Sequence, residues 1–212
     1  MDRESGGKEP AEAGRRPLRR DAELNRRRIL QAGRDVFAAR GLQATLNDVA
    51  HHAGLGVGTV YRKYPDKQTL AEAVFGEELD EIAAMAREAR GEDDAFAALA
   101  GFLERALARA AHNRGLRELM RQDTVEGAGP ARARQEITSH CEHLVARARA
   151  QGMLRDGVTE ADIAPIAAMI DAVLALPGEH PAKMWRRYLA IILDGLRAHP
   201  YQTPLPSPGR AG

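Results

Sequence analysis

Side chains that suit a polyanionic partner gather in a short stretch of the sequence. Thr59 precedes the run Tyr61, Arg62 and Lys63, and Gly58 stands next to them. Arginine can form a bidentate contact with guanine, threonine can meet a thymine methyl group, and tyrosine and lysine can reach phosphate oxygens. A glycine among them lets the backbone approach closely. These residue types are therefore the ones that a major groove requires.

Two short helices joined by a tight turn would present these side chains. Thr45 and Asp48 have the spacing of a capping box, so the first helix begins after Thr45, and Gly54 ends it. The second helix runs roughly from Gly58 to Tyr64. Small and apolar residues that lock a helix-turn-helix pair occur in the required order: Leu46, Val49, Ala50, Ala53, Leu55 and Val60.

The charge of the chain is unevenly distributed although its net value is only +1. Residues 15–67 carry twelve basic and five acidic groups, whereas residues 68–212 carry seventeen basic and twenty-one acidic groups. A basic segment suggests a polyanion partner for that quarter of the chain, and a solvated basic face is the other interpretation of charge alone. The helix-turn-helix pattern lies inside the basic segment, which favours a nucleic acid.

The remaining sequence is helical throughout, with apolar residues at helical spacing and no strand pattern. We expect an all-α chain of about nine helices, in which an N-terminal three-helix helix-turn-helix domain precedes a helical ligand-binding and dimerisation domain. Composition predicts a disordered basic arm over residues 1–20 and a flexible, proline-rich tail over 199–212. The DNA-binding domain then spans 21–66, and the ligand-binding and dimerisation domain spans 67–198.

The stretch from Gly41 to Lys67 resembles the DNA-binding domain of the tetracycline-repressor (TetR) family. The motif order, the Gly-Thr-x-Tyr core at 58–61 and the Tyr-Pro-x-Lys at 64–67 carry the resemblance. It implies an all-helical homodimer that binds an operator in double-stranded DNA and usually holds a small-molecule effector. The segment Trp185–Arg197 is similar to the last helix of many actinobacterial-type members.

The resemblance implies a set of DNA contacts. Thr45 and Lys67 match phosphate-binding positions, and Tyr64 replaces the usual phenylalanine with a residue whose hydroxyl could reach a phosphate. The full set of expected DNA-binding residues is Thr45, Val57, Gly58, Thr59, Tyr61, Arg62, Lys63, Tyr64 and Lys67.

Two further sets of residues follow from the domain organisation. We expect the effector pocket to be lined by Phe96, Leu99, Phe102, Leu103, Leu116, Met120, Cys141, Leu144 and Met169. We expect the dimer interface to use Ile163, Ile166, Ile170, Leu174, Trp185, Tyr188, Leu189, Ile192 and Leu196. The methionines could instead fill gaps in the core, which their helical spacing favours for any single one of them.

The sequence offers little support for a catalytic, metal-binding or dinucleotide-binding site. No nucleophile elbow or paired-carboxylate arrangement predicts a catalytic site, so we expect neither an enzyme nor a cofactor. His140 and His143 lie on one helix face beside Cys141, but no second cluster completes a metal site, and none is expected. The glycines at 54, 56 and 58 do not make a dinucleotide-binding loop, because Thr59 occupies the position where that motif needs its third glycine.

Two alternatives remain open at this stage. One is a dimeric helical protein that binds or converts a small molecule and whose N-terminal domain is incidental. The other is a DNA-compacting protein, which should be basic throughout, unlike residues 68–212. No signal peptide or apolar run of membrane-spanning length is evident. We therefore expect no membrane contact and a cytoplasmic protein. The resemblance to the TetR family implies a bacterial protein that joins the nucleoid when bound to DNA.

Overall fold

The computed structural model describes residues 15–121, 128–176 and 179–206. Nine α-helices and two short 3-10 helices occur in these residues, which confirms the predicted all-α fold. In chain order the elements are α1 (Arg15–Arg40), η1 (Gly41–Gln43), α2 (Leu46–Ala53), α3 (Val57–Lys63), α4 (Lys67–Ala89), α5 (Ala95–Ala111), α6 (Arg114–Arg121), α7 (Ala128–Ala150), η2 (Glu160–Asp162), α8 (Ile163–Leu174) and α9 (Glu179–Leu196).

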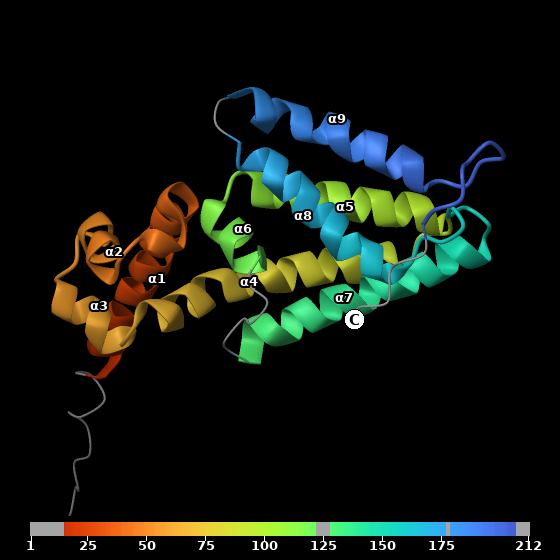
Figure 1. The fold of residues 1–212 in the computed structure, drawn as a ribbon. Helices are drawn as coiled ribbons and strands as arrows, with labels where there is room; N and C mark the ends of the chain where they lie inside the picture. Colours follow the sequence, from red (N-terminus) through yellow and green to blue (C-terminus); the bar gives the residue numbers. More distant parts are fainter. Residues whose placement is uncertain (1–14, 122–127, 177–178, 207–212) are drawn as a thin grey trace, which may run out of the picture.

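The helices form two lobes that share α4 (Figure 1). Helices α1–α3 make the smaller lobe at one end, and α4 runs out of it into a larger lobe formed with α5–α9. Within the larger lobe α4 packs against α5 and α7, and α8 lies between α5 and α9. No helix in the described part of the chain combines the length and hydropathy needed to cross a bilayer.

Local sequence signals set many helix ends. Asp66 caps α4 by accepting a hydrogen bond of 2.7 Å from the backbone N–H of Thr69. Asp94 caps α5 in the same way through Ala97, at 2.8 Å. The third residue of four helices is a proline, a position where the backbone N–H has no intrahelical partner. These prolines are Pro17, Pro130, Pro165 and Pro181.

The glycine and proline residues at Gly127–Pro130 predict a break between helices, and the structure agrees with that prediction only in part. Helix α7 begins at Ala128, and Pro130 belongs to its first turn. Residue 127 lies outside the described residues.

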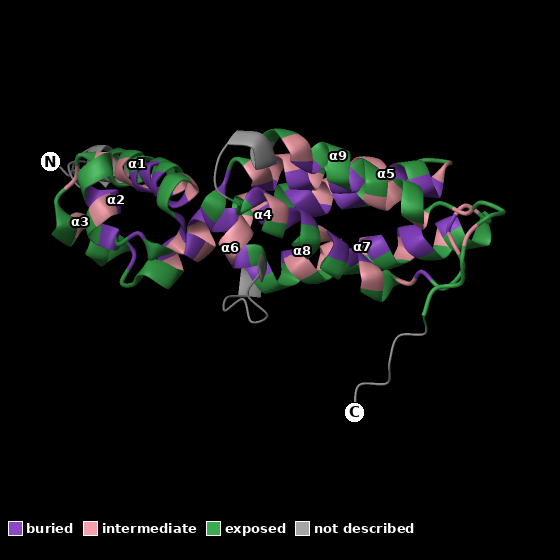
Figure 2. Cartoon of the chain, turned by 45° about the horizontal axis from the view of Figure 1, so that its top comes forward, coloured by how far each residue is buried: buried purple, intermediate pink, exposed green. Residues whose placement is uncertain are grey.

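One apolar core runs through both lobes. It begins with Ile29 in α1, continues along α4 from Leu70 to Ala89, and reaches Val145 in α7. Figure 2 shows the buried positions following α4 from one lobe to the other. A smaller second core lies among α5, α8 and α9, where it is centred on Trp185 and Ile170.

Both predicted flexible ends extend less far than expected. Helix α1 starts at Arg15, so residues 15–20 belong to a helix rather than to an arm, and residues 1–14 lie outside the described residues. At the other end, the backbone of Ala198 donates to Met153 at 2.9 Å, and Leu154 forms an isolated bridge with Arg197.

The beginning of the predicted tail, residues 199–206, also makes side-chain contacts. The guanidinium of Arg155 donates to the Thr203 carbonyl, and the Gln202 amide donates to the Arg197 carbonyl at 2.6 Å. The prediction of a flexible tail over 199–212 is therefore corrected for residues 199–206, while 207–212 lie outside the described residues.

Helix α6 joins the two lobes at very short range. Gly115 faces the aromatic pair Phe37 and Phe75, whose ring centroids are 5.7 Å apart. A Cβ at Gly115 would lie 2.6 Å from Phe75 Cζ and 3.0 Å from the Phe37 carbonyl oxygen. Glycine therefore fits here because nothing larger can enter without moving the backbone of α1.

This close approach predicts a large difference between two glycine substitutions. We expect Gly115→Ala to lower the free energy of unfolding by about 1–3 kcal/mol, because overpacking outweighs the gain in helix propensity. Gly76→Ala in α4 is the matched control, since its Cβ would meet nothing within 4 Å. It should gain up to about 1 kcal/mol. Urea unfolding midpoints measure both, and equal stabilities of the two variants would contradict the packing argument.

Candidate nucleic-acid interface

The first helix of the predicted pair is held in place by a complete capping box. The Thr45 backbone N–H donates to Asp48 Oδ2 at 2.8 Å, and the Asp48 backbone N–H donates to Thr45 Oγ1 at 3.2 Å. The Thr45 hydroxyl also donates to Asp48 Oδ2 at 2.7 Å, and Arg40 pairs with the same carboxyl. Thr45 is exposed, and both its hydrogen and one lone pair are engaged at the helix start. The predicted capping box is confirmed.

Helix α3 is anchored by one residue and displays the others. Val60 is fully buried against the core, while Val57 and Tyr61 are 44% and 46% exposed. Gly58, Arg62 and Lys63 are exposed as well, and Thr59 is half-buried. The helix begins at Val57, one residue before the predicted start. The side chains with groove-binding chemistry therefore share the outer surface of a short helix whose inner side is fixed.

Tyr64 does not belong to this surface, so its predicted phosphate contact is wrong. It is only 5% exposed and lies in the main core. Burial raises the pKa of its hydroxyl, and the neighbouring Arg26 opposes that shift. The reason is its position, because Tyr64 follows the buried Val60 by four residues and so shares the inward side.

Lys67 stands at the start of α4, close to the link between α1 and α2. Its ammonium donates to the carbonyl oxygen of Leu42 in η1 at 2.6 Å and is exposed. An ammonium has three N–H donors, so this contact leaves two directed at solvent or at an anion.

A groove of about 320 Å³ beside α3 adds residues that sequence reasoning missed. It brings Thr59, Arg62 and Lys63 together with Asn25 and Arg26 of α1. The signal was available in the periodicity, because Ile29 is buried and Asn25 precedes it by one helical turn. Helix α1 therefore flanks the exposed face of α3 with an amide and a guanidinium.

The predicted effector-pocket residues divide into two groups. Seven of them lie in the main core: Phe96, Leu99, Phe102, Leu103, Leu116, Cys141 and Leu144. Burial raises the pKa of the Cys141 thiol to about 12, so it stays protonated. Met120 and Met169 are 39% and 52% exposed and are not part of this interior, which corrects the prediction. Met169 is exposed although it follows the buried Ile166 by only three residues, and Met120 is exposed next to Leu119, which is buried.

The interior also holds charged groups that the apolar pattern did not predict. Arg117 of α6 forms an ion pair with Asp171 of α8, with 3.2 Å between Arg117 Nε and Asp171 Oδ1. The same guanidinium donates to the Ala111 carbonyl at 3.1 Å. In the sequence, Asp171 only interrupts the apolar segment 163–176, with no sign of its partner. The ion pair links α6 to α8.

Most residues of the predicted dimer interface make contacts within their own chain instead. Six are buried against neighbouring helices of their own chain: Ile163, Ile166, Ile170, Leu174, Trp185 and Leu189. This part of the prediction is corrected, because residues that neighbouring helices of the same chain already cover, chiefly α5 and the α8–α9 pair itself, are not available to a second copy. Tyr188 is exposed, and Ile192 and Leu196 are half-buried. The apolar side chains on the outer side are instead Met169, Leu176, Tyr188 and Ile191.

The histidines of α7 lie beside cationic groups. His140 Nδ1 is 3.3 Å from a guanidinium nitrogen of Arg90, and both His140 and His143 have lowered pKa values, chiefly through burial and then through Arg90. In residues 15–121, 128–176 and 179–206, no three His, Cys, Asp or Glu side chains converge in a way that could hold a metal ion.

Comparisons with known proteins now bear on this geometry. Residues 29–74 match the family described as bacterial regulatory proteins, tetR family, and residues 94–198 match a C-terminal domain described as transcriptional regulator SbtR-like. The structure of a TetR transcriptional regulator from Streptomyces coelicolor is 30% identical and has a TM-score of 0.56. The match covers 81% of this chain and 98% of that one. The chain belongs to the TetR family.

Other relatives agree with this membership. The structure of a TetR regulatory protein from Mycobacterium vanbaalenii is 32% identical with a TM-score of 0.55, and the match covers 86% of this chain and 100% of that one. A curated HTH-type transcriptional regulator of Staphylococcus aureus is 36% identical over 64 residues. That match spans 30% of this chain and 35% of the relative's length.

A more distant likeness concerns the fold alone. The transcriptional regulator FadR from Bacillus subtilis, solved in complex with stearoyl-CoA, is 16% identical and has a TM-score of 0.58. The match covers 80% of this chain and 98% of the FadR chain.

Membership of the TetR family assigns the chain to DNA-binding transcriptional regulators rather than to enzymes.

The capping box predicts an acid-sensitive step. Hydrogen bonds from Thr45, and then Arg40, lower the pKa of Asp48 from 3.8 to about 2. A carboxyl whose pKa is depressed by folding stabilises the fold above its ordinary pKa, and this contribution is lost as the pH falls towards the folded value. We expect the wild type to lose more thermal stability than Asp48→Asn between about pH 5 and about pH 3. Parallel melting-temperature profiles would argue against the carboxylate's role.

Proposed function

We propose that this TetR-family protein is a homodimeric repressor that binds a near-palindromic operator and is released from it by a small molecule. The observation that carries the proposal is the outer face of α3, where Val57, Tyr61 and Arg62 are exposed while Val60 anchors the helix. A helix held in this way can enter the major groove, which is wide enough for it.

Each side chain of the interface has a chemically distinct role in the proposal. Arg62 reads guanine through two N–H donors, and Thr59 and Val57 meet thymine methyl groups. Tyr61, Lys63 and Lys67 contact phosphates and fix the register of the protein on the duplex. Asn25 and Arg26 of α1, in the groove beside α3, extend the phosphate contacts.

A dimer would place two α3 helices on one side of the DNA. The support is a set of apolar side chains that are exposed in a single chain: Met169 of α8, Leu176 just after α8, and Tyr188 and Ile191 of α9. Burying such side chains against a second copy is favourable by roughly 25 cal/mol per Å². The two recognition helices would then read half-sites about 34–36 Å apart, or a multiple of that distance.

An effector would act from the larger lobe. The B. subtilis FadR structure holds stearoyl-CoA within the same fold, which supports a ligand-binding role for this lobe. The apolar core around Phe96, Phe102 and Leu144 is the proposed location. The ligand must bind the DNA-free conformation more tightly than the DNA-bound one, because only a difference in affinity shifts an equilibrium.

We also propose an actinobacterial-type member of the family that works in the bacterial cytoplasm. The similarity to regulators from Streptomyces and Mycobacterium supports the first part. DNA as the partner supports the second.

The operator can be found by selecting from a pool of randomised duplexes with the purified protein. We expect an inverted repeat from the wild type. Arg62→Ala should lose preference at one or two positions of each half-site, at a cost of about 1–3 kcal/mol. Arg87→Ala, at an exposed arginine near the end of α4 in the larger lobe, is the control and should select the wild-type repeat. An unchanged preference in Arg62→Ala would show that another residue reads the bases.

The outer side of α8 and α9 predicts the effect of a buried charge on assembly. We expect Ile191→Glu, at a side chain that is 56% exposed, to convert the dimer to a monomer of about 23.1 kDa. Tyr201→Glu, at another exposed apolar residue, should leave the dimer intact. Sedimentation equilibrium distinguishes the two masses, and an Ile191→Glu dimer would place the interface elsewhere.

A further inference from the structure

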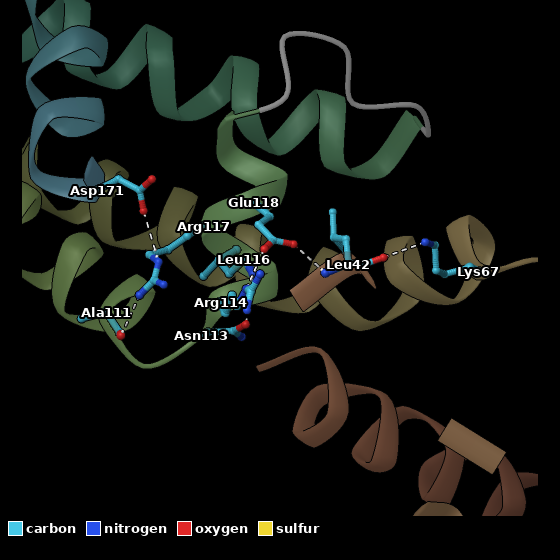
Figure 3. Close-up of polar contacts among 9 residues, drawn as sticks. All are labelled: Leu42, Lys67, Ala111, Asn113, Arg114, Leu116, Arg117, Glu118 and Asp171. Atoms are coloured by element: carbon cyan, nitrogen blue, oxygen red, sulfur yellow. Dashed lines mark hydrogen bonds and ion pairs between the residues drawn. The ribbon is translucent and has the colours of Figure 1, made fainter. Parts of the chain in front are cut away.

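The backbone of Leu42 is held from both lobes at once. Its N–H donates to Glu118 Oε2 of α6 at 2.7 Å, and its carbonyl accepts from Lys67 Nζ at 2.6 Å (Figure 3). Leu42 belongs to η1, the short link between α1 and α2. The larger lobe thus contacts the residue that directs the ammonium of Lys67.

The carboxylate of Glu118 is itself fixed in place. Arg114, one helical turn earlier in α6, donates to Glu118 Oε1 at 2.7 Å, which leaves Oε2 for Leu42. The Glu118 side chain is only 17% exposed, so its hydrogen bonds are weakly screened by water. A charged acceptor in such surroundings makes a stronger hydrogen bond than a neutral one.

The link η1 is shaped to receive this carboxylate. Gly41 has φ of 69°, and a Cβ there would lie 2.5 Å from Glu118 Oε2, so the space of a side chain is taken by the carboxylate. Only glycine adopts this backbone conformation readily. Gly115, in the same helix as Glu118, packs on Phe37 and Phe75 and so fixes the distance between α6 and α1.

We propose that Glu118 is a positioning residue for DNA binding, which acts by orienting Lys67 through Leu42. This rests on the proposed contact between Lys67 and a phosphate. A free lysine loses side-chain entropy when it is ordered on a ligand. In this protein the ammonium is already held by the Leu42 carbonyl, and the bond from Leu42 N–H to Glu118 holds Leu42, and with it this carbonyl, in place.

The consequence is that a residue of the larger lobe, with no contact to DNA, alters a single phosphate contact. Removing the Glu118 carboxylate frees Leu42 and lets the carbonyl turn, so Lys67 no longer points in one direction. The effect differs from a loss of fold, because it changes the number of ions released on binding rather than binding in general.

The experiment measures the salt dependence of binding. The probe is a duplex recovered by selection with the wild-type protein, titrated by fluorescence anisotropy at several salt concentrations. Each phosphate contact contributes about −0.9 to the slope of log K against log salt. Lys67→Ala should reduce the slope by about one contact, Glu118→Ala should reduce it equally, and the double variant should go no further.

Two variants of Glu118 and one control sharpen the test. Glu118→Gln keeps an oxygen for the Leu42 N–H and should retain the wild-type slope. Glu118→Asp withdraws the carboxylate by one methylene and should give the reduced slope even where Glu118→Ala does not fold. Glu142→Ala removes an exposed carboxylate of α7 and should leave the slope unchanged.

The possible failures are distinguishable. A reduced slope in Lys67→Ala together with a wild-type slope in folded Glu118→Ala and Glu118→Asp overturns the positioning role alone. A wild-type slope in Lys67→Ala shows that Lys67 does not contact a phosphate, and then the underlying assignment of the interface fails. An additive loss in the double variant shows that the two residues act separately.

Discussion

Helix α4 has to bury an apolar face along its whole length, in two different surroundings. Leu70, Val74 and Phe75 pack into the small lobe, and Ile82 and Ala86 pack into the large one. The lobes cannot separate without exposing one half of this face to water, which costs roughly 25 cal/mol for each Å² of apolar surface exposed. The position of the recognition helix relative to the larger lobe therefore depends on how one continuous helix is covered.

Helix α6 converts this shared helix into a fixed geometry. Gly115 of α6 meets α1 and α4, Glu118 in its last turn reaches η1, and Arg117 forms a largely buried ion pair with Asp171 of α8. A buried ion pair contributes little net stability but is costly to break by removing one partner. An eight-residue helix thus holds the small lobe, the link and a helix of the proposed dimer surface in one arrangement.

The sequence predicts the DNA-binding lobe well because its signals are local. The capping box at Thr45 and Asp48 and the cap at Asp66 each depend on residues three apart. The phosphate contact predicted for Tyr64 was wrong because the resemblance supplied a residue type but not the direction of its side chain. The four-residue step from the buried Val60 sets that direction.

The larger lobe is harder to predict, since α8 and α9 are apolar on two sides and the pattern does not say which side faces the same chain. Trp185 and Ile170 went inward, and Met169 and Ile191 went outward. The link between Glu118 and Leu42 could not be predicted, because it joins residues 76 positions apart.

The core that runs without a break from Ile29 to Val145 has a practical consequence for finding the effector. Because both lobes share it, they should melt together in one cooperative transition. A compound that binds anywhere on the native chain then stabilises the whole fold and raises the melting temperature of the whole transition. At a ligand concentration of a hundred times the dissociation constant, the free energy of unfolding rises by about 2.7 kcal/mol. Thermal-shift screening of a metabolite library can therefore identify ligands before any operator or target gene is known.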